Sequence, residues 1–121
     1  MPAPSASHPG SGLTPVAFEI LLSLANGPQH GYGIKLDIQE RTSGEVSLGS
    51  GTLYQAIQRL ERDGLIREAP APEESPDARR GRYYQLEPEG QKALEAELRR
   101  LNRVIEYARS HNLISDLKAS G

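Results

Sequence analysis

The chain contains no cysteine among its 121 residues, and this absence removes several classes of function at once. Disulfide bridges and thiolate metal sites both require cysteine sulfur, so neither can form. The absence is compatible with a reducing cytoplasm. The chain also has no tryptophan that could serve as a flat stacking platform, and no apolar run near the roughly 20 residues that a membrane helix needs. We therefore expect no contact with a membrane.

Catalytic and metal-binding patterns are also scarce. The three histidines are His8, His30 and His111, and no pair of them has the spacing of metal ligands. No serine, histidine and acid set lies in a recognisable nucleophile turn. The glycine spacing of residues 44–51 resembles a phosphate-binding loop, but Ser50 stands where the lysine should be and no strand precedes it. The sequence therefore predicts no enzyme, no cofactor and no metal site.

Positive charge is not in excess either. Lysine and arginine total 14 against 16 aspartate and glutamate residues, which gives a formal net charge of -2. A DNA-binding protein needs cations where the phosphates will lie, so the position of the basic residues matters more than their sum. Residues 78–84 carry three arginines and no acid. The pattern favours a localised basic edge over a broad basic face, with Arg79, Arg80 and Arg82 as its cations.

Apolar residues at helical spacing predict three helices in the first half of the chain. The first follows Thr14, a capping residue that is followed by proline. The second runs from near His30 to about Thr42. The third begins at Gly49 and stops at Gly64, a natural left-handed terminator.

The third predicted helix has two chemically different faces. Leu53, Ile57 and Leu60 form a narrow apolar stripe, and the opposite side carries amide and guanidinium groups that can pair with base edges in a major groove. Its first turn would offer free N–H groups to a phosphate. The candidate DNA contacts are Ser50, Gly51, Thr52, Tyr54, Gln55, Gln58 and Arg59. An ordinary amphipathic helix with a solvated polar side remains the alternative.

Two strands are predicted after this helix, at residues 65–69 and 81–87, and the prolines between them exclude a tight turn. Tyr84 and Leu86 are expected on one face of the second strand and Tyr83 on the other. A helix, a strand, an arginine-bearing loop and a second strand form the plan of a winged helix. The wing arginines either contact phosphates or a minor groove, or simply offset the acids of the same loop, which are Glu73, Glu74 and Asp77.

A long final helix is predicted from residue 89 to residue 110, about 33 Å at 1.5 Å per residue. Its apolar residues are spaced alternately by four and three, which is typical of a coiled-coil seam. Such a helix extends beyond so small a core, and a second copy of the chain is the simplest partner for it. The expected dimerisation residues are Leu94, Leu98, Leu101, Ile105 and Ala108.

Several motifs, in order and at sensible spacing over residues 14–90, resemble the PadR family of bacterial transcriptional regulators. They are His30-Gly31-Tyr32-Gly33-Ile34, Gly51-Thr52-Leu53-Tyr54, Leu60-Glu61 with Gly64-Leu65-Ile66, and Arg79-Arg80 with Tyr83-Tyr84 and Leu86. One position departs from the family pattern, because Glu87 stands where a capping threonine is common. Glutamate is a poor N-cap but a favourable charge near a helix N-terminus, so the helix is still expected to begin nearby.

The resemblance implies a mostly helical winged helix-turn-helix protein with a three-helix core, a two-stranded wing and a long C-terminal dimerisation helix. It divides the chain into a disordered tail (1–12), a DNA-binding domain (13–88) and a dimerisation helix with its tail (89–121), of which residues 111–121 are either a helical turn or a frayed end. It implies a cytoplasmic, nucleoid-associated homodimer that binds double-stranded DNA at an inverted repeat, most often as a repressor.

A small hydrophobic effector is a further partner that the resemblance suggests, at the junction of the final helix with the first, where Phe18 and Tyr107 are the aromatic residues to consider. Tyr32 has two open interpretations, since its hydroxyl could meet a phosphate or its ring could pack against a neighbouring helix. The main alternative function is a winged helix that binds protein rather than DNA.

Overall fold

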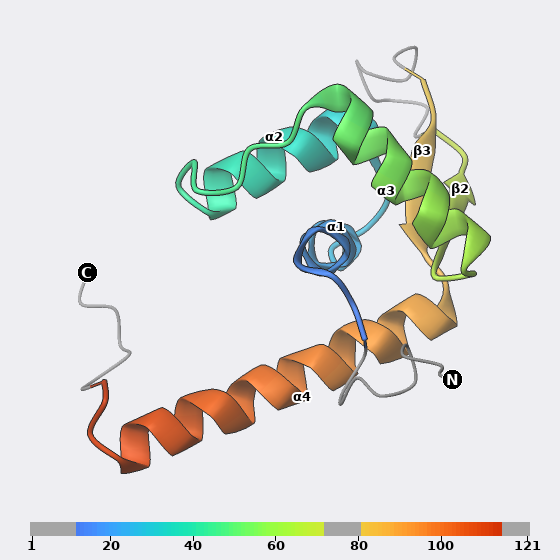
Figure 1. Ribbon diagram of the computed structural model, residues 1–121. Coiled ribbons are helices and arrows are strands. Elements are labelled where there is room, and N and C mark those ends of the chain that lie inside the picture. The colour runs from blue at the N-terminus through green and yellow to red at the C-terminus, as the bar shows by residue number, and fades with distance from the viewer. Residues whose placement is uncertain (1–11, 72–80, 115–121) are drawn as a thin grey trace, which may run out of the picture.

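The computed structural model describes residues 12–71 and 81–114 (Figure 1). Residues 1–11 of the predicted tail, the wing residues 72–80 and residues 115–121 lie outside this part of the chain. The elements in chain order are α1 (Pro15–Leu24), β1 (Gln29–His30), α2 (Gly31–Arg41), α3 (Ser50–Arg62), β2 (Ile66–Ala69), β3 (Tyr83–Leu86) and α4 (Pro88–Ser110). The mostly helical winged-helix plan is thus confirmed.

Local sequence signals account for the ends of the helices. The Thr14 hydroxyl accepts a hydrogen bond from the Ala17 N–H at 3.1 Å, and Pro15 occupies the first turn of α1. The backbone N–H of Gly33 donates to Nδ1 of His30 at 2.9 Å, so a histidine serves as the N-cap of α2. Gly64 adopts a φ of 77° after α3, as a left-handed terminator requires.

The sheet has three strands, one more than the sequence predicted. β3 is its central strand, with β1 antiparallel on one side and β2 antiparallel on the other. β1 contains only two residues, which is too short to show any periodicity. Tyr83 and Tyr84, which are expected on opposite faces of this strand, are both buried. The His30 ring packs edge-on against Tyr83 with 5.2 Å between ring centroids, and so covers the second face of the strand.

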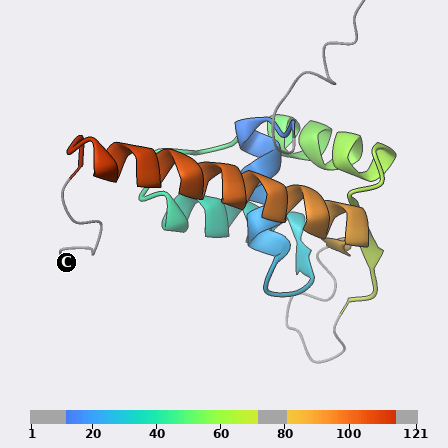
Figure 2. The same cartoon turned by 90° about the horizontal axis from the view of Figure 1, so that it is seen from below.

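The core is built around α1, which is seen end-on near the centre of Figure 1 with α2 above it, α4 below it, and α3 and the sheet to one side. Ile20 and Leu21 of α1 are completely buried and pack with apolar residues from every other helix. Full burial of each such side chain contributes roughly 1.5–3 kcal/mol of transfer free energy. Figure 2 shows that the C-terminal end of α4 continues past the other helices.

The first turn of α4 lies directly on the backbone that enters β2. The Glu87 N–H donates to the Leu65 carbonyl oxygen at 2.9 Å, and Glu87 is the N-cap of α4 without a side-chain hydrogen bond. This confirms that the helix begins at this point despite its unusual capping residue. Gly90 is buried, and a Cβ atom added there would overlap the Leu65 carbonyl oxygen. Only glycine therefore permits this approach of α4 to the wing.

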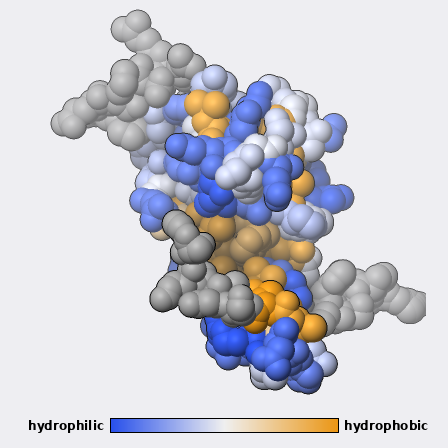
Figure 3. Space-filling view, turned by 90° about the vertical axis from the view of Figure 1, so that its left-hand side faces the viewer, coloured by the Kyte–Doolittle hydropathy of each residue, from blue (hydrophilic) through white to orange (hydrophobic). Residues whose placement is uncertain are grey.

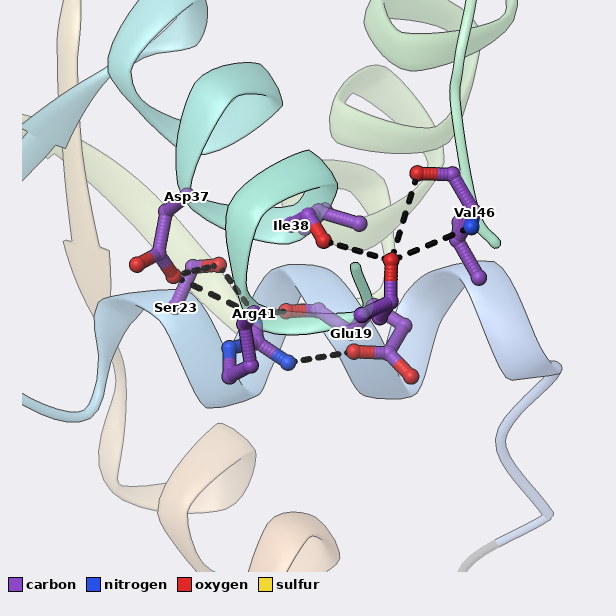
Figure 4. Close-up of polar contacts among 7 residues, drawn as sticks. Glu19, Ser23, Asp37, Ile38, Arg41 and Val46 are labelled. Carbon is purple, nitrogen blue, oxygen red and sulfur yellow. Dashed lines mark hydrogen bonds and ion pairs between the residues drawn. The ribbon is translucent and has the colours of Figure 1, made fainter. Parts of the chain in front are cut away.

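A polar cluster that sequence reasoning missed joins α1 to α2 (Figure 4). The Arg41 guanidinium donates to the Glu19 carboxylate, to Ser23 Oγ at 2.7 Å and to Asp37 Oδ2 at 3.2 Å. Ser23 is only 2% exposed, and its hydroxyl donates to Asp37 Oδ2 at 2.7 Å. The cluster satisfies a buried hydroxyl and fixes the angle between the two helices.

Replacing Arg41 with methionine is expected to lower the free energy of unfolding by about 1–2 kcal/mol, because it leaves two carboxylates close together without their shared cation. Arg41 is partly exposed, so the loss should stay below that of a fully buried ion pair. Urea unfolding at a fixed protein concentration measures the difference. Arg103→Met is the matched control, since Arg103 is exposed and forms no ion pair within residues 12–71 and 81–114. Equal midpoints for the two variants would contradict the stabilising role of the cluster.

Candidate nucleic-acid interface

Helix α3 presents a polar surface to solvent along its whole length. Leu53, Ile57 and Leu60 are buried in the core, which confirms the predicted apolar stripe. The opposite face consists of exposed amide and guanidinium side chains, namely Gln55, Gln58, Arg59 and Arg62. Arg62 belongs to this face by geometry, although it was not among the predicted contacts. Amide and guanidinium groups are the side-chain groups that form bidentate pairs with adenine and guanine.

Two arginines of this face have no ion-pair partner among the described residues. In the described part of the chain, Arg59 and Arg62 form no ion pair, and neither do Arg99 and Arg103 of α4, whereas five other arginines each lie within 4.0 Å of a carboxylate oxygen. These five are Arg41, Arg67, Arg82, Arg100 and Arg109. The cations of α3 are therefore available to an anionic partner, even though the whole chain is slightly acidic.

The start of α3 is open as well. Its N-cap residue is Gly49, which offers no side-chain oxygen to the first-turn N–H groups. Ser50, Gly51 and Thr52 are all exposed. An uncapped helix N-terminus carries partial positive charge and directs backbone donors outward, so this turn can receive an anionic oxygen.

The motif from His30 to Gly33 has a mainly structural role at the junction of α2 with α3. A Cβ added to Gly31 would stand 2.5 Å from the Tyr54 hydroxyl oxygen, so the glycine allows the Tyr54 ring to lie against the first turn of α2. Tyr54 remains 44% exposed and Tyr32 is 49% exposed. About half of the Tyr32 side chain is therefore in solvent, and both interpretations of this residue stay predictions.

The base of the wing is only partly cationic. Nε of Arg82 lies 3.7 Å from Glu68 Oε2, and both side chains are more than half exposed, so this pair is weak. Burial raises the pKa of Tyr84, the Glu61 carboxylate raises it further, and Arg82 acts in the opposite direction. Tyr84 consequently stays neutral at physiological pH. Arg79 and Arg80, the other two predicted wing contacts, lie outside the described residues.

Helix α4 carries a second surface of a different kind. Leu94 is 2% exposed and belongs to this chain's own core, which leaves it little surface for a second copy. Leu98 is 41% exposed, and Leu101, Ile105 and Ala108 are partly exposed on the same side of the helix. Val104 is also exposed and was missed because it falls between the seam positions. Figure 3 shows apolar surface gathered on the face toward which the C-terminal end of α4 points.

The two aromatic residues considered for an effector have separate neighbours. Phe18 packs against the hydrophobic core, and the Tyr107 ring stacks on His111 with 4.0 Å between ring centroids. Within residues 12–71 and 81–114, no three His, Asp or Glu side chains form a group that could hold a metal ion. None of the helices in those same ranges is long and apolar enough to cross a membrane.

Residues 20–96 match the family described as the transcriptional regulator PadR-like family. An uncharacterised 37.1 kDa protein in transposon TN4556 of Streptomyces fradiae is 41% identical over 85 residues, covering 70% of this chain and 22% of that protein. The chain thus spans about a fifth of the length of that curated relative.

Two solved structures resemble the fold. A PadR family transcription regulator from Clostridium difficile has 31% identity and a TM-score of 0.61, with 82% of this chain and 98% of that chain covered. Bacillus subtilis PadR, solved in complex with operator DNA, has 21% identity and a TM-score of 0.57, with 69% and 46% covered.

Proposed function

Because the chain belongs to the PadR-like family of transcriptional regulators, whose members are not enzymes, we propose that it binds double-stranded DNA as a homodimer and represses transcription by occupying a promoter. The observation that carries the proposal is the face of α3, where exposed glutamines lie beside two arginines that no described carboxylate neutralises. A solvated face of an ordinary amphipathic helix does not require unpaired cations. A DNA-binding face needs cations where the phosphates will lie.

The proposed contacts divide into two classes. Gln55, Gln58 and Arg59 enter the major groove and bind base edges. The remaining groups position the protein on the backbone, and they comprise the first-turn N–H groups of α3, the hydroxyls of Tyr32 and Tyr54, and the wing arginines. The fold that the chain shares with Bacillus subtilis PadR, which was solved in complex with operator DNA, supports the proposal of DNA binding.

The dimer is proposed to form through the apolar side of α4. Leu98, Leu101, Ile105 and Ala108 would contact the same residues of a second copy, as a two-fold interface requires. Two base-recognition helices related by this symmetry should bind half-sites about 34–36 Å apart, or a multiple of that distance. The expected operator is therefore an inverted repeat.

The proposal is tested by selecting bound sequences from a random DNA pool and measuring affinity for the selected site by fluorescence anisotropy. Gln55→Ala should weaken binding to that site roughly tenfold, because one bidentate base contact is worth about 1–3 kcal/mol, and should leave binding to unrelated DNA unchanged. Gln39→Ala is the matched control, since Gln39 is exposed on α2 away from α3.

The outcomes separate the two functions under consideration. If Gln55→Ala and Gln39→Ala bind the selected site with equal affinity, α3 does not recognise bases in the proposed way. If the pool yields no enriched sequence at all, the protein-binding alternative, which the net charge of -2 favours, replaces the DNA-binding proposal.

A further inference from the structure

The connection between α2 and α3 is long for two helices that must act together. Helix α2 ends at Arg41 and α3 begins at Ser50, so residues 42–49 join them, whereas a compact helix-turn-helix uses about three or four residues. In Figure 1 the connection runs back along α2 before α3 begins. A hydrogen bond from the Val46 N–H to Thr42 Oγ1 at 3.1 Å closes a turn in its first half. A connection of this length does not set the direction of α3 by itself, so side-chain contacts between the two helices must do so.

The ring of Tyr54 makes such a contact at the start of α2. A Cβ atom added to Gly31 would stand 2.5 Å from the Tyr54 hydroxyl oxygen, 2.8 Å from Cζ and 3.0 Å from Cε1. Any side chain at position 31 would therefore displace the ring. Leu53 and Ile57 hold α3 against the core through apolar contacts, which are not directional. A rigid ring packed on the backbone of the neighbouring helix limits the rotation of α3 in addition.

Helix α2 can serve as the reference for α3 because both of its ends are fixed. At its start, the N-cap residue His30 belongs to β1, pairs with Tyr83 of the central strand and packs its ring edge-on against that tyrosine. At its end, Arg41 joins it to α1 through the polar cluster. Tyr54 thus connects α3 to a helix that is tied to both the sheet and α1. Gln55, the next residue, is a proposed base contact, so a rotation of α3 would move its amide directly.

We propose that Tyr54 is a positioning residue for DNA recognition, whose ring, packed on Gly31, fixes the orientation of α3 against α2. Gln55 then reaches base edges while Tyr32 reaches the phosphate backbone of the same duplex. This inference rests on the proposed function and adds a second role for Tyr54. The positioning role belongs to the ring, whereas the phosphate contact already proposed belongs to the hydroxyl.

The test measures how well each variant discriminates between DNA sequences. The quantity is the ratio of the affinity for the selected site to the affinity for unrelated DNA, both by fluorescence anisotropy. Gly31→Ala displaces the ring but removes no group that contacts DNA, and it should lower this ratio about tenfold, as for the loss of one bidentate base contact. Because Tyr54 is 44% exposed, its ring can turn into solvent, so the fold should survive. Circular dichroism and urea unfolding confirm that it does.

Substitutions of Tyr54 separate the ring from the hydroxyl. Tyr54→Ala removes both and should lower the ratio about tenfold, as Gly31→Ala does. Tyr54→Phe keeps the ring and should leave the ratio unchanged, while its affinity for both DNAs falls by one common factor because a phosphate contact carries no sequence information. A loss of discrimination with a stable fold is a result that a merely structural role would not give.

A double variant and a control complete the design. In the Tyr54→Ala background, Gly31→Ala should cause no further loss of discrimination, because the ring that it displaces is already absent. Leu36→Ala is the matched control, since Leu36 is an exposed residue of α2 that lies more than one turn beyond Gly31. It should change neither the ratio nor either affinity.

Three results would overturn the positioning role. They are a wild-type ratio in Gly31→Ala, losses that simply add in the double variant, and a loss in Tyr54→Phe as large as that in Tyr54→Ala. Failure of the proposed function is distinct from all three, because it would appear in the wild type as the absence of any enriched DNA sequence, and the positioning role would fall with it.

Discussion

Replacing Gly90 with alanine is expected to lower the free energy of unfolding by about 3 kcal/mol, the upper part of the range for overpacking. Alanine normally stabilises a helix relative to glycine by about 1 kcal/mol. Here the added methyl group would meet the Leu65 carbonyl oxygen, which is backbone and cannot rotate away. Helix α4 would have to move, and the movement would expose Leu94, which is now 2% exposed.

The control for this prediction is Gly51→Ala in the first turn of α3. A Cβ at Gly51 would meet no atom within 4 Å, so that substitution should be neutral or stabilising. Urea unfolding of both variants at one protein concentration gives the comparison. Similar midpoints for Gly90→Ala and the wild type would show that the contact of α4 with the wing is looser than the structure indicates.

Leu98→Glu is expected to convert the proposed dimer into a monomer and to reduce affinity for an inverted-repeat site at least about 100-fold. Two copies of the substitution would meet across a two-fold interface and place like charges in an apolar contact. A monomer would also lose the gain of about 10²–10⁴ that comes from tethering two binding units. Leu98 is 41% exposed in the single chain, so the fold itself should survive the change.

Sedimentation equilibrium measures the oligomeric state, and fluorescence anisotropy with the selected DNA measures the affinity. Ala96→Glu introduces the same charge on the opposite side of α4 and should leave both quantities unchanged. If the Leu98→Glu protein stays dimeric, the dimer interface does not lie on the apolar side of α4. If it is monomeric and binds the selected DNA with unchanged affinity, DNA binding does not require a dimer.

Capping residues and the helical spacing of apolar residues made the helices predictable from the sequence. Thr14 with Pro15 begins α1, and Gly64 ends the turn after α3, because capping and left-handed turns depend on only a few neighbouring residues. The apolar stripe of Leu53, Ile57 and Leu60 was predictable for the same reason, since helical spacing alone determines which side is buried.

Three features that sequence reasoning missed depend on residues far apart in the chain. Strand β1 exists only because it pairs with Tyr83 and Tyr84, more than 50 positions later. Arg41 reaches across 22 positions to Glu19, and Gly90 matters only because Leu65 lies against it. Of the candidate site, the composition of the α3 face was predictable, but the contact of Tyr54 with Gly31 and the pairing of Arg82 with Glu68 were not.

The junction at Leu65 and Gly90 has a consequence for how such a regulator can diverge. In the proposed dimer, the contact of Gly90 with the Leu65 carbonyl oxygen sets how α4 meets the rest of its subunit, and so contributes to the distance between the two α3 helices. The bases that are recognised depend instead on solvent-facing side chains of another helix. Duplicated copies of the gene could therefore acquire new target sequences by exchanging those side chains while every descendant kept the same operator spacing.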